Sequence, residues 1–508
     1  MPDSLNLGCI FSDHLGQNRK ALIDLAEGQE RTLTFDELDH LANGVARGLR
    51  KHNLKPGDRV GVLALNRLEY LAVFFGAMRS GLVPAPINIK LSPDMISYIL
   101  EDAGCKLIFA EAEFAHLTPK TIPIVHFGKE FDDFVDFGRF DPFKPAADTV
   151  ALQPYTSGST GKPKGVLLSH SGQMWGPTTA NWAKPESTFL VAAPLYHKNA
   201  LMVTKTAFAK GARIVLMPRF DAKTYIQAIE DYRPETISGV PAMISMLMLE
   251  KSALKHTDLT SVREVSMGSA LAAPLLIRQV QETFNNPKIT IQYGVTEGGP
   301  RMFGDHPDSI PRPIGSCGYP LSGGETKLVE NPKNPMDPGG PLTGELWVRN
   351  PGVMLGYHNL AEATAAKLPG GGWFRTGDIL RRDSDGFYWF VSRMDDMFNC
   401  GGENVYPAEV EAILEKHPAV AQSAVVSVPH KVKGEAPVAF VVLASENAAS
   451  EDDLRRFALE NGPAYAHPRM VFFIDALPLA STNKIDRKSL ESKARILAAE
   501  LSGNKQLN

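Results

Sequence analysis

Short apolar runs of strand type alternate with helical segments along most of this chain. Near the N-terminus, Arg59 to Leu65 and Lys106 to Ala110 are strand-like, and the helical segment Leu68 to Ser80 lies between them. Helix starts are also marked, because Thr34 to Glu37 has a capping-box pattern and Ser92-Pro93 places a capping residue before a proline. Such alternation is typical of a parallel sheet covered by helices. The sequence therefore predicts a layered α/β fold with a largely parallel sheet.

The residue composition and the pattern of predicted elements change twice in the second half of the chain. Glycine and proline become dense from about Pro320 to Val348, which indicates a smaller β subdomain. After Arg393 a compact mixture of helical and strand-like segments follows. A chain of 508 residues is longer than one hydrophobic core supports. We therefore predict a large N-terminal domain over residues 1–394 and a small α+β C-terminal domain over residues 395–508.

Composition argues against several classes of protein. The net charge is −4, and the sequence has no basic stripe of the kind that a nucleic-acid binder needs. No apolar stretch approaches the ~20 residues of a membrane span, and the first residues do not resemble a secretory signal peptide. The 4 cysteines are scattered, which argues against disulfides or a zinc site and is typical of a reducing compartment. We expect a cytoplasmic protein, and the sequence leaves open whether it is a monomer or a homodimer.

A loop rich in glycine, hydroxyl and lysine residues is the strongest local motif. Glycines let backbone amides approach an anion, and hydroxyl and ammonium groups add donors. It is not a Walker A loop, because only two residues separate Gly158 from Gly161. A polyphosphate ligand is the favoured interpretation, and a flexible surface loop is the alternative. The candidate phosphate-binding residues are Thr156, Ser157, Gly158, Ser159, Thr160, Gly161, Lys162 and Lys164.

Two further motifs contain candidate nucleotide-binding residues. Tyr293 to Gly299 follows a predicted strand, and there Glu297 can hold magnesium while Thr296 can donate to a phosphate. Taken alone, this segment is more typical of an ordinary strand-to-helix turn. Asp378 and Arg393 flank a hairpin pattern with an Asp-Gly turn, and an aspartate there can accept hydrogen bonds from ribose hydroxyls.

In this order and spacing, the motifs resemble the acyl-adenylate-forming superfamily of acyl- and aryl-CoA ligases, peptide-synthetase adenylation domains and beetle luciferases. The resemblance extends from about Thr34 to Leu490 and includes residues 193–197, 393–407 and 479–484. It implies an enzyme that uses ATP and Mg²⁺ to convert a small carboxylic acid to acyl-AMP, and then transfers the acyl group to coenzyme A. An enzyme that loads a carrier protein and a non-catalytic acyl-AMP binder are the alternatives, with a luciferase-type oxygenase a remote third.

The resemblance also implies roles for single residues. His197 matches an aromatic residue at the floor of the acyl pocket. Lys484 matches a lysine that bridges the carboxylate and ATP, where its charge offsets the approach of two anions. The implied ATP-binding set is the segment 156–164 around the phosphates, Tyr293 at the adenine, Thr296 at a phosphate, Glu297 at Mg²⁺, and Asp378 and Arg393 at the ribose.

In the C-terminal domain, the resemblance implies a hinge at Asp395. Rotation about this hinge would exchange the loop of Lys484 for the loop of Gly401 and Gly402. Glycines at that place would let the pantetheine thiol of coenzyme A pass close to the backbone. The C-terminal domain is therefore expected to be mobile and to serve both half-reactions.

The sequence departs from the family pattern at three positions. Asn483 replaces the usual glycine before the lysine, which some aryl-acid ligases share. Ala466 replaces a frequent lysine near the coenzyme A surface, although His467 and Arg469 remain available for its phosphates. Lys198 follows His197 beside the acyl pocket, where it would face a polar substrate or, as is usual for a lone lysine, solvent.

The acyl pocket implied by the resemblance is mostly apolar and bulky. That composition favours a modest-sized aromatic or short-to-medium aliphatic acid over a long fatty chain, and methionine-rich walls argue against strict specificity. Gln292 occupies the position where malonate-activating relatives carry an arginine, so a dicarboxylate is less favoured. The implied pocket residues are Trp175, His197, Met202, Met243, Met267, Gly268, Ala270, Gln292 and Gly294.

Overall fold

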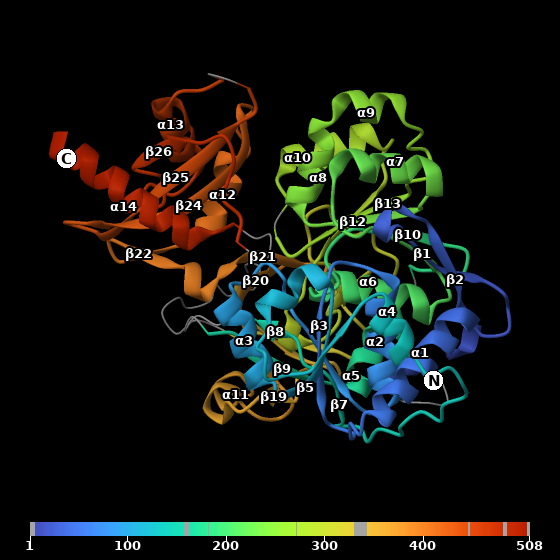
Figure 1. The fold of residues 1–508 in the computed structure, drawn as a ribbon. Coiled ribbons are helices and arrows are strands. Elements are labelled where there is room, and N and C mark those ends of the chain that lie inside the picture. Colours follow the sequence, from blue (N-terminus) through green and yellow to red (C-terminus); the bar gives the residue numbers. More distant parts are fainter. Residues whose placement is uncertain are drawn as a thin grey trace.

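The computed structural model describes residues 6–156, 162–180, 182–270, 272–329, 343–445, 448–480 and 485–504. Figure 1 shows a large N-terminal domain and a separate small C-terminal domain that follows strand β21 (Tyr388–Arg393). The predicted α/β class is thereby confirmed. All four cysteines are free and buried. Over the described ranges, no helix combines the length and apolar character that a membrane span requires.

A seven-stranded sheet forms the centre of the N-terminal domain. Neighbouring strands are parallel except for the antiparallel pair at one edge, so the prediction of a largely parallel sheet is confirmed. Across the sheet the order is β14 (Lys288–Gln292), β13 (Glu264–Gly268), β12 (Thr236–Gly239), β10 (Thr188–Val191), β11 (Arg213–Leu216), β1 (Lys20–Asp24) and β2 (Arg31–Thr34).

A second sheet in this domain has four parallel strands, in the order β4 (Val83–Pro86), β3 (Arg59–Leu63), β5 (Cys105–Ala110) and β6 (Ile124–His126). Helix α1 (Phe35–Lys51) begins at the predicted capping box, where the hydroxyl of Thr34 accepts from the backbone of Glu37. The other long helices of the domain are α2 (Leu68–Arg79), α3 (Pro93–Asp102), α5 (His170–Thr179), α6 (Lys198–Ala209), α7 (Ala222–Tyr232), α8 (Pro241–Leu249) and α10 (Pro274–Thr283).

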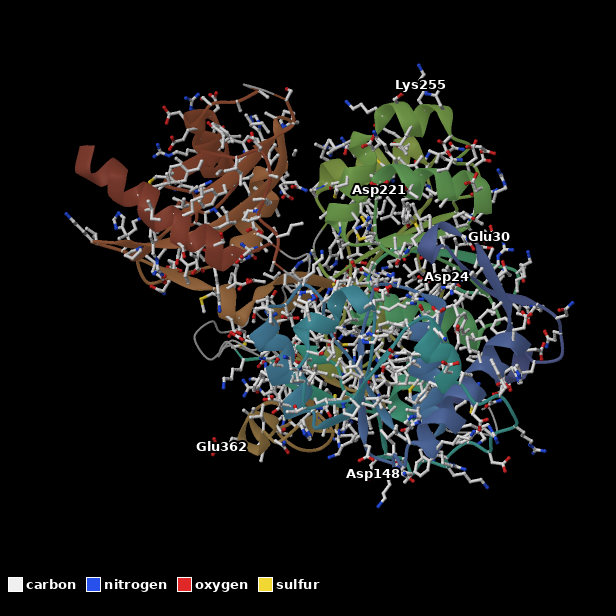
Figure 2. The ribbon with its side chains drawn as sticks, viewed as in Figure 1. Asp24, Glu30, Asp148, Asp221, Lys255 and Glu362 are labelled. Atoms are coloured by element: carbon white, nitrogen blue, oxygen red, sulfur yellow. The ribbon has the colours of Figure 1, made fainter. Side chains whose placement is uncertain are left out.

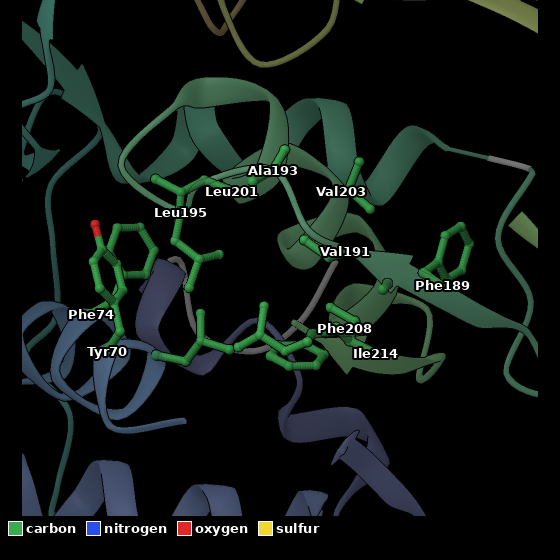
Figure 3. Close-up of a cluster of buried hydrophobic side chains, with 14 of the residues drawn as sticks. Tyr70, Phe74, Phe189, Val191, Ala193, Leu195, Leu201, Val203, Phe208 and Ile214 are labelled. Carbon is green, nitrogen blue, oxygen red and sulfur yellow. The ribbon is translucent and has the colours of Figure 1, made fainter. Parts of the chain in front are cut away.

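Apolar side chains of α2, α6 and the seven-stranded sheet form one continuous core. Figure 3 shows Tyr70 and Phe74 of α2 in this cluster, together with Phe208 of α6 and Ile214 of β11. Buried carboxylates fix the surrounding elements. Asp24, labelled in Figure 2, accepts from the backbone of Leu68 at 3.1 Å and so joins the end of β1 to the start of α2.

Two further four-stranded sheets and a two-stranded sheet of β15 (Phe303–Gly304) and β16 (Tyr319–Pro320) complete the described part of the N-terminal domain. The predicted β subdomain is an antiparallel sheet of β17 (Glu325–Val329), β18 (Thr343–Arg349), β20 (Phe374–Arg382) and β21, so it extends well beyond Val348. The other sheet joins β19 (Gly356–Tyr357), β9 (Lys164–Ser169) and β7 (Val150–Leu152), with β8 (Tyr155–Thr156) also paired to β9. This pairing brings residues after β18 next to the candidate phosphate loop.

The C-terminal domain has its own apolar core around β24 (Val420–His430) and β25 (Gly434–Leu443). Three helices pack on this sheet, namely α12 (Pro407–Leu414), α13 (Glu451–Asn461) and α14 (Arg487–Asn504). Arg487 of α14 lies 3.7 Å from Asp396 and 2.6 Å from Glu411. It therefore ties the residues that follow β21 to the body of the small domain. The remaining strands are β22 (Phe398–Cys400), β23 (Glu403–Val405) and β26 (Met470–Phe473).

Candidate active site

Three of the predicted nucleotide-binding residues meet where β14 ends and the β20–β21 hairpin begins. The hydroxyl of Tyr293 donates to Asp378 Oδ2 at 2.6 Å. Arg393 is the cross-strand partner of Asp378, and its Nε lies 3.6 Å from Oδ1. Burial, and then the charge of Asp378, raise the pKa of Tyr293 well above its usual value, so the hydroxyl remains a donor. The hairpin turn predicted at Asp385-Gly386 is present, and Gly386 has a φ of +85°.

The carboxylate of Glu297 is the centre of a second group of contacts in the site. Glu297 lies in the short 3₁₀ helix Thr296–Gly298 that follows β14. Its Oε1 accepts from Thr156 Oγ1 at 3.1 Å and from the hydroxyl of Tyr357 at 3.0 Å. The ammonium of Lys164 lies 5.3 Å from the centre of the Tyr357 ring. The base of the phosphate loop, the predicted metal ligand and β19 are thus in direct contact.

The arrangement of Glu297 is compatible with a magnesium ion that is shared with a nucleotide. Both donors reach Oε1, and no donor from the described residues reaches Oε2. Over the same residues, no group of three or more histidine, cysteine, aspartate or glutamate side chains forms a ready-made metal cage. Mg²⁺ prefers oxygen ligands and is often held by one or two carboxylates together with substrate phosphates. Glu297 offers one such oxygen.

The candidate phosphate loop is closed at its base by strand pairing. Thr156 of β8 is the antiparallel partner of Lys164 of β9. Lys162 Nζ lies 5.1 Å from the centre of the Tyr98 ring. Ser157, Gly158, Ser159, Thr160 and Gly161 lie outside the described residues, and so does Lys484, whose neighbours Leu479 and Ile485 form an antiparallel bridge. Their roles stay predictions.

Lys198 turns toward the site instead of solvent. It is the first residue of α6, and its ammonium donates to the backbone carbonyl of Val295 at 2.7 Å. A side-chain Cβ at Gly294 would lie 2.8 Å from this ammonium, so glycine leaves the room that the lysine occupies. His197 precedes the helix, with its ring packed edge-on against Tyr196 at 4.6 Å. The solvent-facing orientation expected for Lys198 is therefore wrong.

The implied acyl-pocket residues divide between two faces of the seven-stranded sheet. Met202 and Gln292 line a small cavity beneath α6, and Gly268 is the strand partner of Gln292. Met267 points to the opposite face because side chains alternate along a strand, and Met243 lies on that face in α8. The other members lie apart from the cavity: Trp175 donates to the carbonyl of Ser322, and Ala270 is exposed.

The glycine pair of the C-terminal domain forms the turn of a hairpin. Cys400 and Glu403 are strand partners, and between them Gly401 and Gly402 have φ values of +66° and +96°. Two successive residues with positive φ are what this two-residue turn requires, and glycine takes that conformation without strain. No atom lies within 4 Å of a Cβ built on Gly402, so the turn presents open backbone.

Residues 13–358 match the family described as AMP-binding enzyme, and residues 409–484 match its C-terminal domain. The chain belongs to the AMP-binding enzyme family. The resemblance drawn from the motifs is thereby confirmed.

Relatives of this AMP-binding enzyme cover nearly its whole length. It is 31% identical to 4-coumarate-CoA ligase 1 of Narcissus pseudonarcissus, over 100% of this chain and 96% of the relative. It is 33% identical to the fatty acid--[acyl-carrier-protein] ligase ScoC of Streptomyces coeruleorubidus, over 92% of each. The crystal structure of the anthranilate CoA ligase AuaEII in complex with anthranoyl-AMP superposes with a TM-score of 0.86 at 27% identity, covering 98% and 99% of the two chains.

Tyr357 belongs to the site of this AMP-binding enzyme, although no motif in the sequence marks it. Its segment, Gly-Tyr-His-Asn, has no residue pattern tied to metal or phosphate binding. The tyrosine reaches Glu297 because β19 pairs with β9, where Tyr357 is the partner of Val166. Burial, and then the charge of Glu297, raise the pKa of Tyr357, which keeps the hydroxyl protonated as a donor.

Replacing Tyr357 by phenylalanine is expected to raise the Mg²⁺ concentration for half-maximal pyrophosphate release about tenfold, because a hydrogen bond to a charged group contributes roughly 1.5–3 kcal/mol. Nucleotide binding measured without Mg²⁺ by calorimetry should change little. Tyr232→Phe is the matched control, since Tyr232 donates to the surface carboxylate of Glu30 at 3.0 Å, away from the site. An unchanged Mg²⁺ dependence in Tyr357→Phe would show that Tyr357 does not position Glu297.

Proposed function

We propose that this chain is an ATP-dependent carboxylic acid–CoA ligase. In the first half-reaction a carboxylate oxygen of the acid attacks the α-phosphorus of ATP, which forms acyl-AMP and releases pyrophosphate. In the second, the thiol of coenzyme A attacks the acyl carbon, AMP leaves with the bonding electrons, and the thiol proton passes to solvent. One observation carries the proposal: a cluster suited to a ribose, at Asp378, and a carboxylate suited to a metal ion, Glu297, both lie close behind the end of β14.

The described residues support distinct tasks in the first half-reaction. Lys164 lies at the base of the phosphate loop, so its charge can attract and orient the leaving pyrophosphate. Asp378, held between Tyr293 and Arg393, can accept from ribose hydroxyls. Glu297 would hold Mg²⁺, which when bound supplies positive charge against the phosphate oxygens. Lys484 lies outside the described residues, and the family resemblance alone implies that it would bring the acid's carboxylate to the α-phosphorus.

Coenzyme A is favoured as the acyl acceptor by a basic cluster beside the glycine turn. The backbone of Gly401 donates to the carbonyl of Lys433 at 2.9 Å, so Lys433 borders the turn. Arg469 and His467 contact each other at 2.6 Å. Burial lowers the pKa of His467, and the positive charges of Arg469, Arg455 and Lys433 lower it further. The four basic side chains therefore interact electrostatically. Such a cluster can bind the phosphates of coenzyme A in the absence of a lysine at Ala466.

Replacing Arg469 by alanine is expected to raise the KM for coenzyme A about tenfold, because a charge-assisted hydrogen bond to phosphate contributes roughly 1.5–3 kcal/mol. Pyrophosphate release without coenzyme A should stay within about twofold of the parent, because the cluster lies in the C-terminal domain, beside the turn of Gly401 and Gly402. Arg495→Ala, an exposed arginine of α14, is the matched control. An unchanged KM would remove Arg469 from the coenzyme A site.

The proposal is tested by pyrophosphate release with ATP and Mg²⁺ across benzoates, cinnamates and C2 to C12 aliphatic acids, with and without coenzyme A. Turnover that requires both an acid and coenzyme A supports the ligase assignment. The aromatic rings of Trp182 and Phe189 beside the cavity favour an aromatic acid, with short-to-medium aliphatic acids next. Release with an acid but no gain from coenzyme A would favour a carrier-protein acceptor, as in the ScoC relative, and no release with any acid would contradict the proposal.

A further inference from the structure

A cavity of about 260 Å³ lies at the amino ends of strands β3, β4 and β7, and it has no part in the proposed reaction. We call it the Arg59 cavity, because Arg59, Val83 and Val150, the first residues of these strands, line it. Asp148, close to Val150 in the chain, lies in Figure 2 at the lower edge of the N-terminal domain, away from the C-terminal domain. Ligands of α/β sheets usually bind beyond the carboxyl ends of the strands, where Glu297 lies. The Arg59 cavity is therefore separate from the candidate active site.

One wall of the Arg59 cavity is fixed by the chain that precedes β7. The ring of Phe143 lies on the backbone of Gly81, since a Cβ at Gly81 would be 2.8 Å from the ring. Gly81 has a φ of +81°, which glycine adopts without strain. The backbone N–H of Phe143 donates to the carbonyl of Arg79 at 2.7 Å, and its carbonyl accepts from Asn6 at 2.9 Å. The cavity is therefore formed before any ligand arrives.

The walls of the Arg59 cavity are apolar. Their carbon surface comes from Pro56, Val83, Phe143 and Val150. An apolar cavity of about 150 Å³ is large enough to hold benzene. The Arg59 cavity, at about 260 Å³, therefore has room for a six-membered ring with one small polar group, and it is partly open to solvent.

Arg59 supplies the positive charge of this cavity. Its Nε donates to Gln153 Oε1 at 3.1 Å, and its Nη1 donates to the carbonyl of Gly57 at 3.0 Å. Within the described part of the chain, Nη2 makes no hydrogen bond and Arg59 has no ion pair. None of the described residues that line the cavity is acidic. A guanidinium binds a carboxylate through two parallel N–H groups, so the free side of Arg59 is suited to a carboxylate.

A chain of hydrogen bonds connects Arg59 to the base of the phosphate loop. The amide of Gln153 is fully buried and donates to the hydroxyl of Tyr155 at 3.0 Å. Tyr155 donates to Asp102 Oδ2 at 2.7 Å, and it is the strand partner of Gly165. A Cβ at Gly165 would lie 2.7 Å from Gln153 Nε2 and 3.0 Å from the ring of Tyr155. The chain of bonds therefore packs against both ends of the loop.

We propose that the Arg59 cavity is a regulatory site for a small monocarboxylic acid with an apolar body, and that its occupation tightens ATP binding. The carboxylate would pair with the guanidinium, and the body would contact Val83, Phe143 and Val150. A second carboxylate would lose its hydration against these apolar walls, which is costly without a partner. A neutral analogue would forgo the charge-assisted hydrogen bonds to Arg59. The ligand class is therefore an acid with one charge.

The coupling to ATP follows from the position of Gln153. A carboxylate on the free side of the guanidinium would hold Arg59 in one conformation, and with it the amide of Gln153. Thr156 follows Tyr155 and donates to Glu297 at 3.1 Å, so the fixed region reaches the carboxylate proposed to hold Mg²⁺. ATP then has less of the loop base to fix when it binds, so less conformational entropy is lost. This step rests on the proposed role of the loop at the ATP phosphates.

The probe for the test is benzenesulfonate, whose sulfonate carries the charge of a carboxylate and cannot form an acyl-AMP. Calorimetric titration of the full chain should show a binding site that is lost in Val150→Phe, which fills the cavity with a ring. Arg59→Gln should weaken binding at this site about tenfold or more, because it removes charge-assisted hydrogen bonds. Leu249→Phe of α8 and Arg495→Gln of α14, both exposed, are the matched controls.

The coupling is measured by repeating the titration with ATP and Mg²⁺ and without an acid. ATP should tighten benzenesulfonate binding about fivefold, and benzenesulfonate should tighten ATP binding by the same factor, because coupling between two sites is reciprocal. Tyr155→Phe removes the hydroxyl between Gln153 and Asp102. It should reduce the coupling to within about twofold while benzenesulfonate alone binds as in the parent.

Val150→Met is a smaller filling of the cavity and tests the same site if Val150→Phe does not fold. Equal affinity for benzenesulfonate in the parent, the Val150 variants and Arg59→Gln would place the anion elsewhere and overturn the site. An ATP affinity that benzenesulfonate leaves unchanged would overturn the regulatory role. These titrations need no turnover, so either failure leaves the ligase proposal standing. A chain that binds benzenesulfonate but no ATP would contradict the proposed function and the coupling, while the site itself stands.

Discussion

Replacing Glu297 by glutamine is expected to slow pyrophosphate release about 10²- to 10³-fold at saturating ATP and acid. The amide oxygen of glutamine can still accept hydrogen bonds from Thr156 and Tyr357, so both contacts of residue 297 are preserved. The substitution removes the negative charge that attracts Mg²⁺ to this position. Loss of one preorganised electrostatic group at a reacting phosphate typically costs a factor of this size.

The measurement is a titration of Mg²⁺ in the pyrophosphate-release assay, combined with thermal unfolding of both proteins. Glu297→Gln should retain the melting temperature of the parent to within a few degrees, because two hydrogen bonds to Oε1 remain possible. Glu362→Gln, an exposed glutamate of helix α11 (Ala361–Lys367), is the matched control. Full activity of Glu297→Gln at ordinary Mg²⁺ would remove Glu297 as the metal ligand.

Local chemistry explains why many elements of this fold could be predicted from the sequence. The capping box at Thr34 and the Asp-Gly turn at 385–386 depend on residues a few positions apart, and both are present in the structure. The apolar runs Arg59 to Leu65 and Lys106 to Ala110 likewise predict strands, which the structure has at Arg59–Leu63 and Cys105–Ala110. Their bounds follow from neighbours in the chain, so no knowledge of the tertiary fold is needed.

The parts of the site that the sequence does not reveal depend on pairing between distant segments. Tyr357 meets Glu297 across 60 positions, and only the pairing of β19 with β9 brings them together. Met267 and Gln292 lie on adjacent strands, but the register of β13 and β14 decides that they point to opposite faces.

The hinge prediction concerns the short segment after β21. Asp395 is the middle residue of the 3₁₀ helix Met394–Asp396, and it is exposed. The next residue, Asp396, faces Arg487, which also binds Glu411. Asp395 is therefore the last position before the chain is tied to the C-terminal domain. A change of φ and ψ here would rotate that domain as one body.

Replacing Asp395 by proline is expected to leave acyl-AMP formation within about twofold of the parent and to slow acyl transfer to coenzyme A about 10²-fold. Proline fixes φ near −65° and restricts the residue before it, so the segment is confined to one conformation. A domain held out of place by even about 1 Å can cost this factor in rate. The family resemblance implies that the two half-reactions use different domain arrangements, so a fixed segment slows only the step that follows the rotation.

Single-turnover stopped-flow experiments separate the two steps. Pyrophosphate release without coenzyme A reports adenylation, and the addition of coenzyme A to preformed acyl-AMP complex reports transfer. Asp395→Ala serves as the control, since it removes the carboxylate and keeps the backbone free. If Asp395→Pro slows both steps equally, the substitution disturbs the site as a whole and the hinge is elsewhere. If transfer alone slows in the proline variant and not in the alanine variant, rotation about residue 395 is part of the cycle.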